Sequence, residues 1–232
     1  SDIVRTVQQG GFDNVLLPSG YDLGIDTLAF ASAIAPTITT MKLLAAIRCG
    51  EMWVPQLARQ LATINQILNG RLSINIISSE MPGESLDGPH RYTRTIETMN
   101  SLRTLLNGER LDIEGEFIQL HLDAPRICRE SPQVPQFYFG GLSDEARDAA
   151  AAAADVYLMW PDTEDAIAAT ITDLRSRAAA YNRTLKFGYR VHVIVRETED
   201  EARNAAAQSH RQGKEADRRH HRAQAKIEVT GL

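Results

Sequence analysis

Cysteine is scarce in this sequence, whose 232 residues include only two, Cys49 and Cys128. Their spacing matches neither a zinc-binding pattern nor the paired cysteines of a disulfide framework. We therefore expect no metal site and no disulfide framework. This cysteine usage is typical of a reducing compartment, so we expect a cytoplasmic protein.

The sequence also has fewer basic than acidic residues, and it has no long apolar run. The chain has 25 lysines and arginines against 30 aspartates and glutamates, a formal net charge of −5. A nucleic-acid-binding surface usually needs a basic face. No uncharged apolar run approaches the roughly 18 residues that a membrane span requires. The first residues, SDIVRTVQQGGF, lack the basic start and apolar centre of a signal peptide. We therefore expect neither a nucleic-acid nor a membrane partner.

What the chain does contain is a series of short apolar runs separated by helical patterns. The runs cover residues 13–19, 42–48, 72–78, 135–141, 155–160 and 187–197. The segment VPQLARQLATINQIL has leucine or isoleucine every three or four positions, as an amphipathic helix does. Ser143 and Thr163 precede two further helical patterns as candidate N-caps. The alternation of strand and helix predicts right-handed βαβ units and a parallel sheet.

Two architectures fit such a sheet, a (β/α)8 barrel and a doubly wound open sheet. A dinucleotide-binding open sheet should show G-x-G-x-x-G after its first strand, and LLPSGYDLG does not supply it. Polar or small residues instead recur where the predicted strands end, as expected of a TIM barrel whose top face collects one contribution per strand. They are Ser19-Gly20, Arg48, Ser78-Ser79, Gly140-Gly141 and Trp160.

The barrel pattern has one insertion and an incomplete strand count. The interval 80–134 is about twice a normal crossover, and we expect it to hold a helix and then a hairpin in ERLDIEGEFIQLHL. Six barrel-type strands are found, so a single barrel domain over 1–232 is expected to lack its first and last strands. Residues 208–232 are densely charged without apolar periodicity, which predicts an irregular or disordered tail.

Arg190 and His192 stand in the middle of the last apolar run, FGYRVHVIVRE. Residues two apart on a strand point to the same face. Both polar side chains would therefore occupy one space. That space is either a salt-bridged interior or an active site.

Six stretches of the chain closely resemble the bacterial luciferase-like flavin monooxygenases, and the two-component alkanesulfonate monooxygenases in particular. They are GGFDNVLLPSG, GRLSINIISSEMPGE, RYTRTIE, GEFIQL, PQFYFGGLSDEARDAAAAAADVYLMWPDT and KFGYRVHVIVRETEDEA. The resemblance covers roughly residues 1–207. It implies a TIM barrel that binds reduced FMN (FMNH2) at its C-terminal face. It also implies a separate NAD(P)H:FMN reductase, O2 as co-substrate, and a C4a-peroxyflavin that oxidises an alkanesulfonate or similar organosulfur substrate to an aldehyde and sulfite. Helices around a barrel often bury a dimer face, so a homo-oligomer, a dimer or tetramer, is expected.

The resemblance also implies the cofactor-binding residues. It assigns the FMN phosphate to Gly140, Gly141, Leu142 and Ser143, where backbone N–H groups and a helix dipole favour an anion. The alternative there is an ordinary strand–helix turn with a serine cap. Asn75 corresponds to the amide beside the flavin ring, with Ser78 at the end of its strand. Arg91 and Tyr92 correspond to a pair that closes over the phosphate, and Ala46 to a small residue beside the reactive edge of the flavin. Core packing explains Ala46, and a solvated helical turn explains Arg91, nearly as simply.

The resemblance further implies that Arg190, His192 and Trp160 line the catalytic site near the sulfonate. A guanidinium pairs with a buried anion, and an imidazole exchanges a proton near neutral pH. One departure weakens the case for the sulfonate more than that for the flavin, because PSGYDLGIDT lacks the active-site cysteine of the alkanesulfonate enzymes. Asp26 matches the acid of that stretch, and Cys49 is a candidate to reach the same pocket. The alternatives left open are a deazaflavin F420-dependent oxidoreductase and a non-catalytic barrel subunit.

Overall fold

The computed structural model describes residues 2–209 and 211. Residues 1–190 form one compact unit, and the described residues from 191 onward belong to a second. Within the described residues, no helix is both long and apolar enough to cross a bilayer. A single domain over 1–232 stays a prediction.

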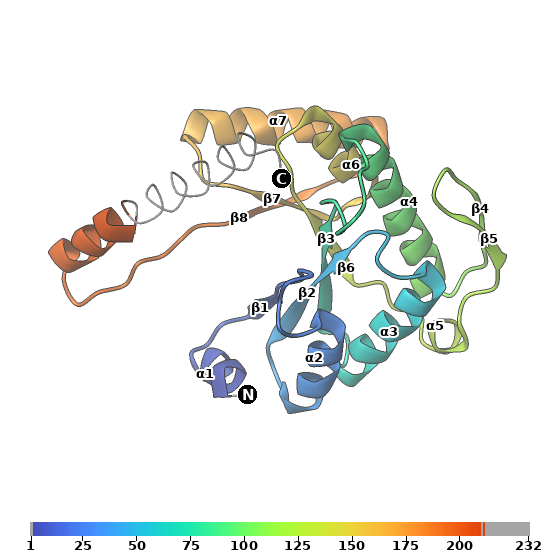
Figure 1. Cartoon of the computed structure of the whole chain (residues 1–232), viewed down its shortest axis with the longest axis horizontal. Coiled ribbons are helices and arrows are strands. Elements are labelled where there is room, and N and C mark those ends of the chain that lie inside the picture. The colour runs from blue at the N-terminus through green and yellow to red at the C-terminus, as the bar shows by residue number, and fades with distance from the viewer. Residues whose placement is uncertain (1, 210, 212–232) are drawn as a thin grey trace, which may run out of the picture. The chain divides into compact units, whose positions relative to one another are not determined.

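The first unit is built on a six-stranded sheet in which every neighbouring pair is parallel. The spatial order is β1-β2-β3-β6-β7-β8 (Figure 1). The strands are β1 (Asn14–Leu17), β2 (Lys42–Arg48), β3 (Leu72–Ile77), β6 (Gln136–Phe139), β7 (Val156–Met159) and β8 (Lys186–Tyr189). Each coincides with one of the predicted apolar runs. The sheet is the parallel βαβ sheet that the sequence predicts.

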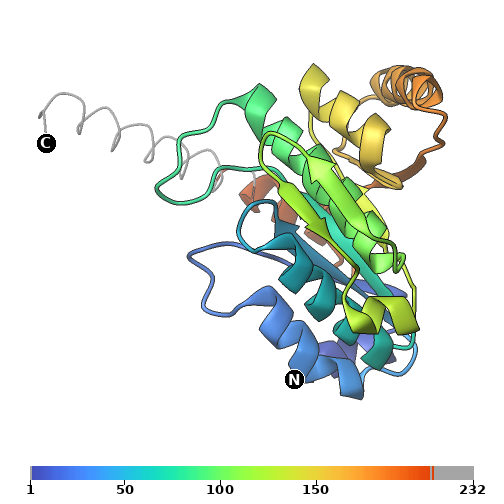
Figure 2. The ribbon, with the colours of Figure 1, turned by 90° about the vertical axis from the view of Figure 1, so that its right-hand side faces the viewer.

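The helices form a layer on one face of this sheet. They are α1 (Asp2–Gln9), α2 (Thr27–Ile34), the 3-10 turn η1 (Ala35–Thr37), α3 (Val54–Ile67), α4 (Gly88–Leu106), α5 (Arg126–Glu130), α6 (Asp144–Ala153) and α7 (Glu164–Ala180). Along the sheet α2 contacts α3, α3 contacts α4, α4 contacts α6 and α6 contacts α7 (Figures 1 and 2). Within this layer α5 packs against α3 and α4. On β2, Leu43, Ala45 and Ile47 join the core under the helices, whereas Leu44 and Ala46 do not. A doubly wound sheet carries helices on both faces, so covering on one face favours the wall of a barrel.

The helix starts follow from local chemistry. The side chains of Asp26, Ser143 and Thr163 each accept the backbone N–H three residues later, at 2.7, 3.2 and 3.3 Å. Each of these contacts satisfies one of the four N–H groups that a helix start leaves without an intrahelical partner. The N-caps predicted at Ser143 and Thr163 are confirmed.

The interval 80–134 contains α4, α5 and the antiparallel hairpin of β4 (Leu111–Glu114) and β5 (Gln119–Leu122). The hairpin lies beside α4 (Figures 1 and 2). Glu97 on α4 holds its turn, because the carboxylate accepts the N–H groups of Glu116, Phe117 and Ile118 at 2.8–3.0 Å. A Cβ at Gly115 would lie 2.5 Å from Glu97 Cδ. A larger residue at this position would therefore displace the carboxylate that holds the turn.

The last strand is shorter than the sequence predicts. The run 187–197 was expected to be a buried strand, but β8 ends at Tyr189. The only strand that pairs with β8 among the described residues, β7, ends at Met159, and the final backbone hydrogen bond joins Arg190 N to Met159 O at 3.0 Å. Beyond that point the chain has no described neighbour to complete a ladder, and Val193 is 74% exposed.

The second unit contains an extended segment and a helix over 199–209. Thr198 and Glu201 form a reciprocal capping box at the start of this helix, with N–H contacts at 3.2 and 3.3 Å. The predicted irregular tail, 208–232, begins inside the helix. Residues 210 and 212–232 lie outside the described residues.

Candidate functional site

A cavity of about 370 Å³ opens where the parallel strands end. Its walls come from β3, the following loop, the first turn of α4, and the ends of β6, β7 and β8. The lining residues are Asn75, Ile76, Ile77, Ser78, Ser79, Arg91, Tyr92, Phe139, Gly140, Leu158, Trp160 and Arg190. Seven of the sequence-predicted residues are among them: Asn75, Ser78, Arg91, Tyr92, Gly140, Trp160 and Arg190. Segments far apart in the sequence thus meet in one hollow.

Strand register explains why these side chains converge. Ala46 lies opposite Asn75, Asn75 opposite Tyr138, Tyr138 opposite Val156, and Val156 opposite Lys186. These five residues form one row on the face of the sheet away from the helices. Side chains alternate along a strand, so residues two or four positions further on project to the same face. Gly140, Trp160 and Arg190 occupy those positions.

Two arginines line the cavity, Arg91 and Arg190. Among the described residues, no carboxylate pairs with Arg190. Its Cζ lies 4.2 Å from the ring centroid of Trp160, and both side chains are exposed. Stacking on an aromatic face orients a guanidinium while leaving its in-plane N–H donors free. The pair can therefore present a fork of donors to an anion. In the part of the chain that the structure describes, Arg190 forms no core salt bridge, which was the alternative interpretation of this residue.

Arg91 is the second cavity cation, and it is already paired. Its Nη1 donates to Glu80 Oε1 at 2.7 Å and to the carbonyl of Leu86 at 3.3 Å. Beside it the Tyr92 ring packs edge-on against Phe139, with centroids 6.4 Å apart. The Ser78 hydroxyl is hydrogen-bonded to Thr95 at 2.6 Å. This wall of the cavity combines a cation, an aromatic ring and hydroxyl groups.

The Gly140-Gly141 turn is shaped by packing. A Cβ at Gly140 would lie 2.5 Å from the carbonyl oxygen of Leu158, and one at Gly141 would lie 2.5 Å from Ala146 Cβ. The Tyr157 hydroxyl donates to the carbonyl of Gly141. Both glycines are therefore required whether or not a ligand approaches them.

The rest of the predicted phosphate loop lies beyond the cavity wall. Leu142 is 74% exposed, and the Ser143 hydroxyl is engaged as the cap of α6. Asp144 and Glu145 place two carboxylates in the first turn of α6, where they oppose the attraction of the helix dipole for an anion. Of the four predicted loop residues, only Gly140 lines the cavity.

We expect Gly140→Ala to destabilise the protein by about 1–3 kcal/mol, because the added methyl group meets a backbone carbonyl that cannot rotate away. Chemical denaturation of the purified protein measures this loss. Gly24→Ala is the matched control, because a Cβ at Gly24 has nothing within 4 Å and should cost little or stabilise slightly. Equal stability of the two variants would contradict the packing argument.

Three further predicted residues lie outside the cavity lining. Ala46 is 2% exposed and sits on β2 beside Asn75. His192 belongs to the second unit, where it is exposed, and its catalytic role stays a prediction. Asp26, matched to an acid of the related enzymes, caps α2.

The suggestion that Cys49 reaches the pocket is wrong. Cys49 directly follows β2, is 1% exposed, and belongs with Ile47 to the core under the helices. Burial raises the pKa of its thiol to about 11, although hydrogen bonds to Thr95 and Thr98 and the charge of Arg94 act in the opposite direction. The thiol is therefore neutral and packed at physiological pH.

Sequence reasoning missed several lining residues. Leu158 is two residues from Trp160, and Ile77 is two residues from Asn75. Side chains two apart on a strand share a face, so this alternation could have identified both residues. Glu80, which pairs with Arg91, has no such signal because it lies in a loop.

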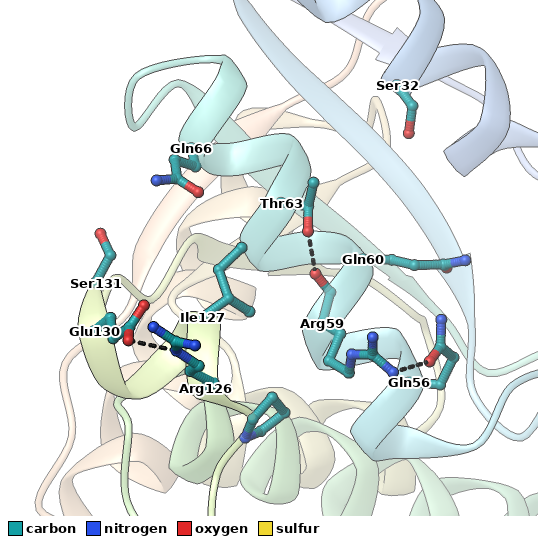
Figure 3. Close-up of a pocket in the computed structure, with 11 residues that line it drawn as sticks. Ser32, Gln56, Arg59, Gln60, Thr63, Gln66, Arg126, Ile127, Glu130 and Ser131 are labelled. Atoms are coloured by element: carbon teal, nitrogen blue, oxygen red, sulfur yellow. Dashed lines mark hydrogen bonds and ion pairs between the residues drawn. The ribbon is translucent and has the colours of Figure 1, made fainter.

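A larger hollow of about 550 Å³ lies between α3 and α5 (Figure 3). Both of its arginines are paired with other residues of the lining. Arg59 donates to Gln56 at 3.1 Å, and Arg126 to Glu130 at 2.6 Å. This hollow is in the helical layer, away from the strand ends, and contains none of the predicted site residues. Among the described residues, no group of three or more histidines, cysteines or carboxylates could hold a metal ion. The strand-end cavity is therefore the candidate site.

Comparison with known proteins identifies the relatives of this chain. Sulfoquinovose monooxygenase of Novosphingobium aromaticivorans is 59% identical over 209 residues, which are 87% of this chain and 58% of that protein. Sulfoquinovose monooxygenase of Agrobacterium fabrum is 44% identical over 208 residues, 89% of this chain and 54% of that protein. The chain therefore spans about half the length of these curated relatives.

The fold and the family are shown by two further comparisons. The solved EDTA monooxygenase of Chelativorans sp. BNC1 superposes with a TM-score of 0.77 at 16% identity, over 89% of this chain and 57% of that one. At that identity the likeness concerns the fold alone, and it confirms the predicted TIM-barrel class. The family model of the luciferase-like monooxygenases matches residues 1–230. This chain belongs to the luciferase-like monooxygenase family.

Proposed function

We propose that the protein is an FMN-dependent monooxygenase that cleaves the carbon–sulfur bond of a sulfonated substrate, sulfoquinovose or a similar organosulfonate. One observation carries the proposal: Arg190 stands in the strand-end cavity, stacked on Trp160, with no described carboxylate partner. A sulfonate is a permanent anion near neutral pH and needs a cation in a confined site. The names of the two sulfoquinovose monooxygenase relatives support the same substrate class.

The residues present fit the flavin. Asn75 and Ser79 supply polar groups, Tyr92 and Trp160 supply aromatic surface, and Arg91 supplies a positive charge, all around one cavity. The absence of a side chain at Gly140 leaves backbone accessible to a ligand. When bound, reduced FMN supplies the electrons that activate O2. In the proposed reaction one oxygen atom enters the carbonyl of an aldehyde, the other leaves as water, and sulfite departs.

The roles of the side chains follow from their chemistry. Arg190 would bind the sulfonate, and Trp160 would orient the guanidinium by stacking. Asn75 would donate to or accept from the polar edge of the flavin ring. His192 would exchange the proton that the reaction requires. An NAD(P)H:FMN reductase partner, a homo-oligomeric state and a cytoplasmic location remain parts of the proposal.

The test uses the full-length protein. We expect it to bind reduced FMN and, with a flavin reductase and O2, to release sulfite from sulfoquinovose or an alkanesulfonate. Tighter binding of F420 than of FMN would favour the oxidoreductase alternative. Flavin binding without turnover on any sulfonate would favour a non-catalytic subunit. If the protein neither quenches flavin fluorescence nor consumes oxygen, the proposed function is wrong.

A further inference from the structure

We propose that Glu80 is a built-in competitor for Arg91, which an anionic ligand must displace before it can use that guanidinium. The inference rests on the proposed function, because the ligand we have in view is the phosphate of FMN. Its structural basis is independent of that function: a cation that lines the cavity is already bound by a carboxylate of this same chain.

The ion pair is direct and accessible. Arg91 Nη1 lies 2.7 Å from Glu80 Oε1, with the arginine side chain 24% exposed and the glutamate 57% exposed. Arg91 is thus held in the wall, while the carboxylate that engages it borders solvent. An exposed carboxylate loses little on rehydration, so it can leave the pair at low cost. These are the properties of a displaceable partner.

The loop that carries Glu80 has anchors of its own. Arg48 at the end of β2 donates to the carbonyl of Glu80 at 2.7 Å and also to the hydroxyl of Ser79. Further along the loop, Glu84 forms a bidentate pair with Arg94. The backbone therefore does not depend on the Glu80–Arg91 contact. The Glu80 side chain can rotate away while the loop stays in place.

The two cavity cations differ because of Glu80. This carboxylate neutralises Arg91, whereas Arg190 has no carboxylate partner among the described residues. A phosphate monoester carries about −1.5 to −2 charges at neutral pH, more than the single charge of the carboxylate that it replaces. Glu80 would therefore admit a phosphate to Arg91 and disfavour weaker anions. The pair makes the site selective for the phosphate-bearing form of the ligand.

Flavin binding to the full-length protein tests this inference without any turnover. Dissociation constants of oxidised FMN and of riboflavin, which lacks the phosphate, are measured by fluorescence quenching for the wild type and for Glu80→Gln. We expect Glu80→Gln to bind FMN about two- to fivefold more tightly, the effect of removing one exposed ion pair. Riboflavin affinity should not change.

Glu130→Gln is the matched control, because Glu130 also forms a single exposed pair with an arginine, Arg126, but in the outer hollow. It should leave both constants unchanged. Unchanged or weaker FMN binding by Glu80→Gln, with the wild type still preferring FMN to riboflavin, would overturn the inference and leave the proposed function standing. A wild type that binds neither flavin would overturn both.

Discussion

Replacing Arg190 by alanine is expected to lower the turnover of a sulfonated substrate roughly 10- to 100-fold, the effect of losing a hydrogen-bonded charged partner. FMN affinity should stay nearly constant, because Arg91 and the polar groups of the opposite wall remain. The loss should appear mainly in kcat/KM for the sulfonate. Steady-state sulfite release and flavin titration measure the two quantities separately.

Arg175 offers a matched control for Arg190. Its guanidinium also lies over an aromatic ring of β8, with Cζ 5.6 Å from the centroid of Phe187, but Phe187 packs against the core under the helices. Arg175→Ala therefore removes a comparable contact away from the cavity and should leave turnover unchanged. Arg190→Lys keeps the charge without the planar fork and should fall between alanine and the wild type. A parallel loss of FMN binding and turnover in Arg190→Ala would refute the assigned role.

Replacing Arg94 by methionine is expected to cost about 2–3 kcal/mol of the free energy of unfolding. The Arg94 side chain is 7% exposed and forms a bidentate pair with Glu84, with Nη2 to Oε2 at 2.9 Å. It also lies over the Phe117 ring and against the backbone of Gly50. The side chain therefore joins two strand-end loops to the hairpin. Because Glu84 is 26% exposed and can rehydrate, the expected cost is below that of a fully buried pair.

The effect of Arg94→Met should depend on pH. The hydrogen bond from Arg94 is the first cause that lowers the pKa of Glu84 below its usual value near 4.5. A lowered folded-state pKa contributes stability above the unfolded pKa, and that stability is lost as the pH falls through the folded value. The gap between wild type and variant should therefore shrink below about pH 4.

Arg110→Met serves as the control for Arg94→Met, because the Arg110–Asp123 pair is exposed at both ends, 56% and 69%, and should contribute less than about 1 kcal/mol. Denaturant unfolding at pH 7 and at about pH 3, below the pH at which the gap should begin to shrink, measures all three proteins. A stability gap between wild type and Arg94→Met that is equal at both pH values would show that packing alone, and not the ion pair, accounts for the loss.

The pattern of residues along short stretches of sequence was sufficient to predict the strands of the sheet and the starts of two helices. The six apolar runs, the caps at Ser143 and Thr163, and the break between the hairpin strands at Gly115 each depend on neighbours within a few residues. The error at β8 has the same origin. The alternation of Val191, Val193 and Val195 is typical of a strand, but a strand also needs a partner, and β7 ends at Met159. The alternation of apolar residues in one strand does not indicate where the neighbouring strand, here β7, ends.

The sequence by itself determined that alternate residues of neighbouring parallel strands share one face at the strand ends, and Asn75, Trp160 and Arg190 lie on that face. Tertiary structure alone decided which charges in the cavity are paired. Arg91 and Arg190 carry the same charge in the sequence, yet of the two only Arg91 has a described carboxylate within reach, supplied by a loop whose course depends on Arg48 and Arg94. Ion pairing depends on distances of a few ångströms between loops, and no period along the chain encodes such distances.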